Sequence, residues 1–287
     1  MTSQTLHTNP PPDFLLEPII RNALTEDFGR AGDLTSDLLL DAKQTAKAVI
    51  AARQDGVLSG LVAAALAFRI VDPAVKVIVR SADGSAIEHG STIAELEGPA
   101  CAILSAERVA LNFVGHLSGV ASATHALVSR VKGTKARIVC TRKTIPGLRI
   151  LQKYAVRCGG GFNHRFGMDD AILVKDNHIA AAGGLEPVIS RLKERLGHMI
   201  KVEVEVDTLD QLETALRLGV DTILLDNMSP EQLRRGVAMT NGRAILEASG
   251  GISLESVREV AESGVDYISS GAITHSAVNL DLGLDFE

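Results

Sequence analysis

The second half of the chain alternates between short apolar runs and helical patterns, and this alternation limits the possible folds more than any other feature. Six predominantly apolar runs are predicted to be strands, at residues 137–140, 171–175, 199–206, 222–226, 244–248 and 267–270. Apolar residues recur at helical spacing between them, at 150–158, 184–196, 209–218, 230–239 and 254–263. Apolar strands that alternate with helices favour parallel pairing, with helices covering the sheet. We therefore predict an α/β fold with an incomplete (β/α) barrel of about six parallel strands.

The first half of the chain is organised differently and predicts a separate α+β domain. A flexible tail is expected at 1–12, which is polar and ends in three prolines. A helix is predicted from Asp13 to about Phe28, and a long helix from Ser105, a favourable N-cap residue, to about Val131. The predicted parts are an N-terminal α+β domain with a long connecting helix at 13–134, the barrel at 135–275, and a C-terminal segment at 276–287 that we expect to return to the N-terminal domain.

Composition excludes several classes of function. Aromatic residues make up 3% of the chain, Trp is absent and the net charge is −6, all of which disfavour binding to nucleic acid. The N-terminus lacks the pattern of a signal peptide, and the longest apolar run, 61–68, is too short to cross a bilayer, so no membrane partner is expected. The cysteines, Cys101, Cys140 and Cys158, lack metal-binding spacing and are expected to be reduced thiols of a cytoplasmic protein.

Positive charge is concentrated in one part of this acidic chain. The window 130–178 holds eleven Lys or Arg residues and three acids, whereas the whole chain has 29 basic and 35 acidic residues. Such a local excess predicts an electrostatic funnel for a small, highly anionic ligand.

Polar residues follow the predicted strands at their carboxyl ends, where the loops of a parallel barrel share one rim and carry the active site. Charged or small residues stand at the carboxyl ends of four predicted strands, namely Thr141-Arg142-Lys143, Lys175-Asp176-Asn177-His178, Asp226-Asn227 and Ser249-Gly250-Gly251. The last strand ends in Ser269-Ser270-Gly271, and small residues after the last two strands are typical of a phosphate site.

The third predicted strand alternates strictly between charged residues and valine. A period of two directs the valines outward and Lys201, Glu203, Glu205 and Asp207 inward. Buried charges are costly unless they are paired or bind a ligand. Glu205 and Asp226 are therefore predicted to meet ribose hydroxyls or Mg²⁺.

These motifs, taken together, resemble the quinolinate phosphoribosyltransferase family. The strongest matches are Thr-Arg-Lys-Thr-x-Pro-Gly-x-Arg at 141–149, Gly-Gly-Gly-x-x-His-Arg at 159–165, Lys-Asp-Asn-His at 175–178, Glu-Val-Glu-Val at 203–206, Leu-Leu-Asp-Asn at 224–227 and Glu-Ala-Ser-Gly-Gly-Ile at 247–252. Cys140 departs from the pattern, since many relatives have Asp before the Thr-Arg-Lys motif. The resemblance implies transfer of phosphoribose from phosphoribosyl pyrophosphate to quinolinate with decarboxylation, giving nicotinate mononucleotide, pyrophosphate and CO₂ for NAD biosynthesis. It also implies Mg²⁺ as cofactor and a cytoplasmic homodimer.

The resemblance also implies roles for individual residues. Quinolinate would be bound by Arg142, His164, Arg165 and Lys175, together with Arg108 from the neighbouring subunit. The catalytic residues would be Lys143, which holds pyrophosphate-side oxygens, and Glu205 and Asp226, which hold the ribose and lie near Mg²⁺, directly or through water. The 5-phosphate would be bound by Ser249, Gly250, Gly251, Ser270 and Gly271.

Three alternatives stay open at this point. Lys175 after an apolar strand also suits a Schiff-base aldolase or isomerase acting on a sugar phosphate, although that activity leaves five or more further cations unexplained. The family's relative that is encoded with molybdate transporters is a second alternative. A non-catalytic anion-binding protein is the third, and it leaves the inward acids without a purpose.

Overall fold

The computed structural model describes residues 9–286, and its contacts divide the chain into two compact units. The first unit consists of Met1–His125, Thr144–Gly160 and Ala272–Glu287, and the second of Ala126–Lys143 and Gly161–Gly271. Thr144–Gly160 thus packs with the N-terminal part, although it falls within the range predicted for the barrel. The predicted tail lies mostly outside the described residues. None of the described helices is long and apolar enough to cross a membrane.

The first unit contains an antiparallel sheet with the strand order β12-β1-β5-β3. The chain's last strand, β12, pairs along β1, so the C-terminal segment lies in the same unit as the N-terminal strands. The elements of this unit, with α4 extending beyond it by a few residues, are α1 (Asp13–Phe28), α2 (Leu34–Leu39), β1 (Thr45–Ala52), β2 (Gly56–Val57), α3 (Leu61–Val71), β3 (Lys76–Val79), β4 (Ala86–Ile87), β5 (Thr92–Pro99), α4 (Ala100–Arg130), α5 (Arg149–Cys158), α11 (Ala272–His275) and β12 (Leu282–Phe286).

The long helix α4 begins earlier than its sequence predicted. It starts at Ala100, directly after β5, so the prediction of Ser105 as its N-cap is wrong. The Ser105 hydroxyl instead donates a hydrogen bond of 2.8 Å to Asp33 Oδ2. Asp33 also accepts hydrogen bonds from the backbone N–H groups of Thr35 and Ser36, and thereby caps α2.

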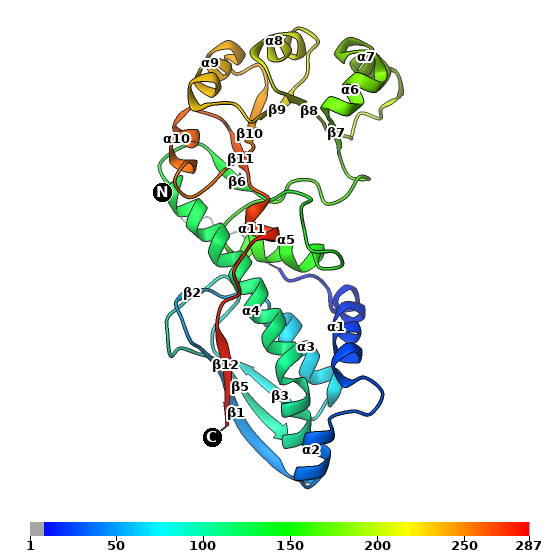
Figure 1. Ribbon diagram of the computed structural model, residues 1–287, viewed down its shortest axis with the longest axis vertical. Coiled ribbons are helices and arrows are strands. Elements are labelled where there is room, and N and C mark those ends of the chain that lie inside the picture. The colour runs from blue at the N-terminus through cyan, green and yellow to red at the C-terminus, as the bar shows by residue number, and fades with distance from the viewer. Residues whose placement is uncertain (1–8, 287) are drawn as a thin grey trace. The chain divides into compact units, whose positions relative to one another are not determined.

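The second unit is a six-stranded parallel sheet with the order β6-β11-β10-β9-β8-β7. In Figure 1 the strands form an arc, with α8, α9 and α10 on its outer side. The edge strands β6 and β7 do not pair with each other in the described chain, so the prediction of an incomplete barrel of six parallel strands is confirmed. Its elements are β6 (Arg137–Val139), β7 (Ile172–Val174), α6 (Asp176–Ala182), α7 (Leu185–Arg195), β8 (Val202–Val206), α8 (Leu209–Arg217), β9 (Thr222–Asp226), α9 (Pro230–Thr240), β10 (Ile245–Ser249), α10 (Val257–Glu262) and β11 (Tyr267–Ser269).

The strand β8 shows how the sequence directs side chains in this sheet. Its valines Val204 and Val206 are buried, and Glu203 and Glu205 point to the opposite face, as the alternation predicts. Lys201 differs from the prediction. It precedes the strand, is exposed and pairs with Asp221 at 3.6 Å, because β8 begins only at Val202.

Candidate active site

The carboxyl ends of the parallel strands surround a cavity of about 370 Å³. Thirteen side chains line it, and all of them belong to the second unit: Thr141, Arg142, Lys143, His164, Arg165, Leu173, Lys175, Glu205, Leu224, Asp226, Glu247, Ser249 and Ser269. The cations predicted to bind quinolinate within one subunit therefore share one cavity with both predicted ribose-binding acids. This convergence follows from parallel pairing, which brings the ends of six strands to one edge of the sheet.

The remaining predicted site residues do not line the cavity. Arg108 lies on α4 in the first unit, where its side chain is 66% exposed and its guanidinium is 3.9 Å from Glu107. Gly250 and Gly251 follow the lining residue Ser249 in the chain. Ser270 is buried, and its N–H donates to the carbonyl of Val139, so it ties the end of β11 to β6.

Ser269 lines the cavity in the place predicted for Ser270. Successive residues of a strand point to opposite faces, and the sequence Ser269-Ser270 alone does not indicate which serine points inward. The strand β11 ends at Ser269, and its phase is set by pairing with β10 and β6. Leu173 and Leu224 were also missed, since apolar strand residues carry no signal for a polar site.

Lysine and acid side chains meet on one side of the cavity. Lys175 Nζ lies 3.2 Å from Glu205 Oε2, and the Glu205 side chain is 12% exposed. The neighbouring Asp226 accepts a hydrogen bond of 2.7 Å from the side chain of Asn227. The two carboxylates offer oxygen atoms of the kind that bind ribose hydroxyls or Mg²⁺.

Two arginines on the cavity wall repel each other. The pKa of Arg165 lies below its usual range, first because the group is partly buried and second because the positive charge of Arg142 is close. The Arg165 Nη1 group donates to the carbonyl of Ala171 at 3.1 Å. A bound anion would relieve this repulsion, so the pair is suited to a carboxylate or phosphate ligand.

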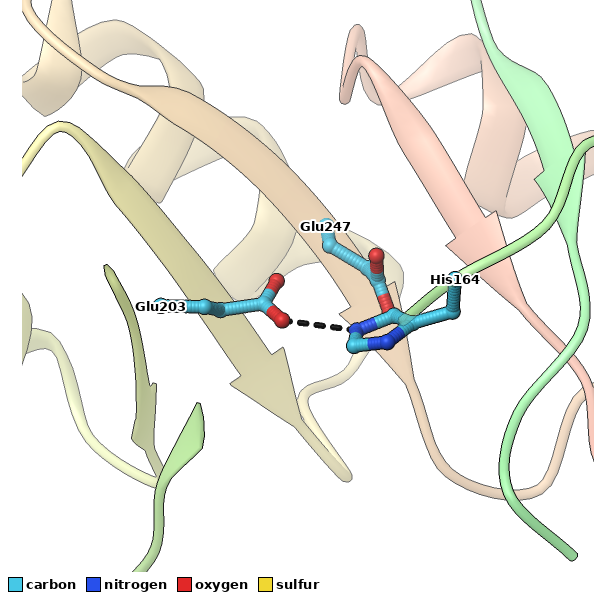
Figure 2. Close-up of side chains that lie close together, drawn as sticks. All are labelled: His164, Glu203 and Glu247. Atoms are coloured by element: carbon cyan, nitrogen blue, oxygen red, sulfur yellow. Dashed lines mark hydrogen bonds and ion pairs between the residues drawn. The ribbon is translucent and has the colours of Figure 1, made fainter. Parts of the chain in front are cut away.

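Two buried acids flank His164 at one wall of the cavity (Figure 2). His164 Nε2 lies 2.7 Å from Glu203 Oε2 and 3.8 Å from Glu247 Oε1. Burial, and then the charge of Glu203, raise the pKa of Glu247 to about 7. The potential ligand atoms of these three side chains lie within 4.8 Å of one another, which is close enough to hold a metal ion. The sequence did not predict this cluster, since its members come from three segments far apart in the chain and meet only in the folded sheet.

Comparison with known proteins decides the family. The family model for the C-terminal domain of quinolinate phosphoribosyl transferase matches residues 120–285, and that for the N-terminal domain matches residues 33–118. The chain belongs to the quinolinate phosphoribosyltransferase family. The predicted family is thus confirmed, and the two matched domains together cover most of the chain.

Relatives of this phosphoribosyltransferase family are similar along nearly their whole length. A probable nicotinate-nucleotide pyrophosphorylase (carboxylating) from Bacillus subtilis is 43% identical over 270 residues, which is 94% of this chain and 93% of the relative. A crystal structure of nicotinate-nucleotide pyrophosphorylase from Ehrlichia chaffeensis is 42% identical with a TM-score of 0.91, covering 94% of this chain and 98% of that one. The corresponding structure from Francisella tularensis is 39% identical with a TM-score of 0.93, covering 99% and 100%.

Proposed function

We propose that this chain is a nicotinate-nucleotide pyrophosphorylase of the carboxylating type, which acts in NAD biosynthesis. It transfers phosphoribose from phosphoribosyl pyrophosphate to the ring nitrogen of quinolinate and releases pyrophosphate and CO₂. The names of the full-length relatives support this activity. The single observation in the molecule that carries it is a cavity in which three cations, Arg142, Arg165 and Lys175, face two acids, Glu205 and Asp226.

The cations suit the two adjacent carboxylates of quinolinate. A guanidinium group can bind a carboxylate with two parallel hydrogen bonds, so two arginines fix the orientation of the ring as well as its charge. His164 lines the same wall, and Lys175 approaches from the end of β7. Substrate carboxylates would replace the arginine–arginine repulsion with attraction, which favours the dianion over a neutral pyridine.

The acids suit the sugar. As the quinolinate nitrogen forms its bond to the anomeric carbon, the bond from that carbon to pyrophosphate breaks and pyrophosphate takes the electron pair. Positive charge builds up on the sugar ring during this step, and the carboxylates of Glu205 and Asp226 would stabilise it. Lys143 would neutralise the leaving pyrophosphate. The catalytic effect is therefore positioning together with fixed charge.

Decarboxylation then needs no further group from the protein. The bond from the ring carbon to the 2-carboxylate breaks, CO₂ leaves, and the electron pair is stabilised by the positively charged ring nitrogen. The electron pair on the ring carbon then takes a proton from water, and nicotinate mononucleotide results.

Glu205 and Asp226 are also the residues that we propose to lie at Mg²⁺. Mg²⁺ is bound in proteins through one or two carboxylates together with substrate phosphates and water, and these two acids fit that donor set. When bound, the ion would neutralise charge on the pyrophosphate group. We further propose, from the resemblance to the family, a cytoplasmic homodimer in which the exposed Arg108 reaches the partner's quinolinate site.

A Schiff-base aldolase or isomerase is less well supported. A lysine that forms a Schiff base is activated by desolvation or by a neighbouring cation. The Lys175 side chain is instead 49% exposed and is paired with a carboxylate, Glu205. Borohydride should therefore trap no adduct between Lys175 and a carbonyl substrate, and a trapped adduct would support the alternative.

The proposed activity is tested by incubating the purified chain with quinolinate, phosphoribosyl pyrophosphate and Mg²⁺. We expect nicotinate mononucleotide and CO₂ in equal amounts, and neither product when phosphoribosyl pyrophosphate is left out. Binding of quinolinate without either product would instead support a non-catalytic anion-binding protein.

A further inference from the structure

Glu203 is a buried acid that the proposed reaction does not use. Its side chain is 10% exposed, lies on the inner face of β8 and points at His164 (Figure 2). Its Oε2 atom is 2.7 Å from His164 Nε2, the length of a strong hydrogen bond to a carboxylate. A buried carboxylate without such a partner would be costly, so this hydrogen bond stabilises both groups.

The second nitrogen of the same imidazole also has a partner. His164 Nδ1 accepts a hydrogen bond of 2.8 Å from the backbone N–H of Arg165. An accepting Nδ1 carries no proton, so Nε2 must carry the ring proton and donate it to Glu203. The ring makes both hydrogen bonds as a neutral imidazole, and turning it over would break both.

These hydrogen bonds form a continuous chain from β8 to the cavity. Glu203 fixes the tautomer and the plane of His164, and His164 in turn fixes the backbone of Arg165. The Arg165 side chain is held separately at the Ala171 carbonyl. A guanidinium that binds a flat diacid has to be held within a fraction of an ångström, so anchoring its backbone affects ligand binding directly.

Glu247 is the second acid near His164 Nε2. It is 5% exposed, its Oε1 lies 3.8 Å from His164 Nε2, and that oxygen makes no hydrogen bond with any residue in the described chain. Two acids and an imidazole can also bind a transition metal. In a tetrahedral zinc site, however, the nitrogen and oxygen ligands lie about 3.3 Å apart. The 2.7 Å separation of Nε2 and Glu203 Oε2 fits a shared proton instead.

We infer that Glu203 is a positioning residue for the pyridine-dicarboxylate pocket, which acts through His164 on Arg165. Only the kinetic consequences of this inference depend on the proposed function. The tautomer and the hydrogen bond of His164 can be measured without any substrate.

The variants that test the inference are Glu203→Gln, which keeps an accepting oxygen, and Glu203→Ala, which removes it. Glu213→Gln is the matched control, because Glu213 is an exposed acid on the neighbouring helix α8. Two-bond nitrogen–proton spectra of histidine-labelled protein, with His164 assigned through His164→Asn, report the tautomer. We expect Nε2–H in wild type, with a proton resonance shifted downfield by the carboxylate. We expect that resonance to move upfield in Glu203→Gln and the fixed tautomer to be lost in Glu203→Ala.

The kinetic expectation is a change in one Michaelis constant. In Glu203→Ala, KM for quinolinate should rise about 10- to 100-fold, as for other residues that orient an imidazole. KM for phosphoribosyl pyrophosphate should stay unchanged, and Glu203→Gln should restore most of the loss. If Glu203→Ala does not fold, the upfield shift in Glu203→Gln decides the test.

Three results would overturn the inference. One is a His164 spectrum that is the same in wild type and Glu203→Gln. Another is an equal rise of both Michaelis constants in Glu203→Ala. The third is stoichiometric Zn²⁺ binding to wild type that Glu203→Gln abolishes, which would make the cluster a metal site. If wild type turns over no quinolinate, the proposed function fails, whereas the spectra still decide the role of Glu203.

Discussion

The residues of this site act through the environment that the sheet gives them. Arg142, Arg165 and Lys175 are ordinary cations in the sequence, and the folded sheet brings them to one cavity with two acids. Arg142 and Lys175 could be predicted because charged residues at the ends of apolar strands are conspicuous, whereas Arg165 was expected only from the resemblance to the family. The Glu203–His164–Glu247 cluster could not be predicted, because its contacts depend on which strands become neighbours and on where each strand ends.

Removing one cation should abolish turnover without unfolding the protein. We expect Arg142→Ala or Lys175→Ala to lower kcat/KM by at least about 10³-fold, because a charge-assisted contact to the substrate is lost. In Lys175→Ala, Glu205 also loses its counterion. Thermal unfolding should stay close to wild type. The exposed Arg195 on α7 provides the control variant Arg195→Ala. Normal rates in Arg142→Ala or Lys175→Ala would remove these residues from the site.

Glu247 should make stability depend on pH. Its pKa in the folded chain is raised to about 7, mainly by burial, so the folded state binds more protons than the unfolded state between its ordinary value and about 7. The stabilisation that comes from the bound proton is complete below the unfolded pKa and is lost as pH rises through the folded pKa.

Glu247→Gln removes this titration. Wild type should therefore lose stability between about pH 5 and about pH 8 that the variant does not lose. The difference in free energy of unfolding, variant minus wild type, should be larger at pH 8 than at pH 5 by an amount on the order of 1–3 kcal/mol. Urea unfolding at both pH values measures it, with Glu213→Gln as the exposed control. A difference between variant and wild type that is the same at both pH values would contradict the assignment.

At the scale of elements, the sequence predicted periodic segments well and their ends less well. The helix α1 and the strand β9 have the predicted bounds, since their apolar patterns end just before turn residues, Gly29 and Asn227. The start of α4 was wrong because Ser105, a good cap in isolation, forms a hydrogen bond with Asp33 from another element. The helix α6 was missed because it has no buried residue in the described structure, and therefore no apolar pattern.

The turn after β10 depends on Gly250. Its φ of +94° is unfavourable for other residues, and a Cβ there would meet the backbone nitrogen of Asn227 at 2.9 Å as well as that residue's side chain. Gly250→Ala should lower stability by about 1–3 kcal/mol and raise KM for phosphoribosyl pyrophosphate, since the turn follows the lining residue Ser249.

The control variant Gly242→Ala separates the loss of stability from the rise in KM. Gly242 has a φ of +74°, but no atom lies within 4 Å of the position that its Cβ would take. The Gly242→Ala substitution should lower stability through backbone strain while leaving both Michaelis constants unchanged. Equal Michaelis constants for Gly250→Ala and wild type would show that the turn does not serve the sugar phosphate.

At the scale of the whole molecule, the two units are interleaved in sequence. The last strand, β12, pairs with β1, and Thr144–Gly160 packs with the N-terminal part. Contacts between segments this far apart in the chain leave no local pattern in the sequence. The alternation of strands and helices predicted the parallel sheet of the second unit, whereas no pattern in the sequence indicated that Thr144–Gly160 belongs to the first unit.

The proposed homodimer is tested by complementation between two inactive variants. Arg108→Ala and Lys175→Ala should each be inactive alone. If Arg108 serves the partner's site, each mixed dimer has one site with both defects and one intact site. Half of randomly reassembled dimers are mixed, so about a quarter of wild-type activity should return. No recovery after mixing, with dimers confirmed by light scattering, would indicate that Arg108 serves its own subunit or none.

The central claim is that this cavity recognises a pyridine with two carboxylates beside an activated sugar. The most direct measurement compares kcat/KM for quinolinate and nicotinate, each with phosphoribosyl pyrophosphate and Mg²⁺. Nicotinate lacks the second carboxylate and would leave cations of the cavity without a partner, so quinolinate should be preferred by at least about 10³-fold. Comparable rates with the two acids, or turnover of nicotinate alone, would contradict the account.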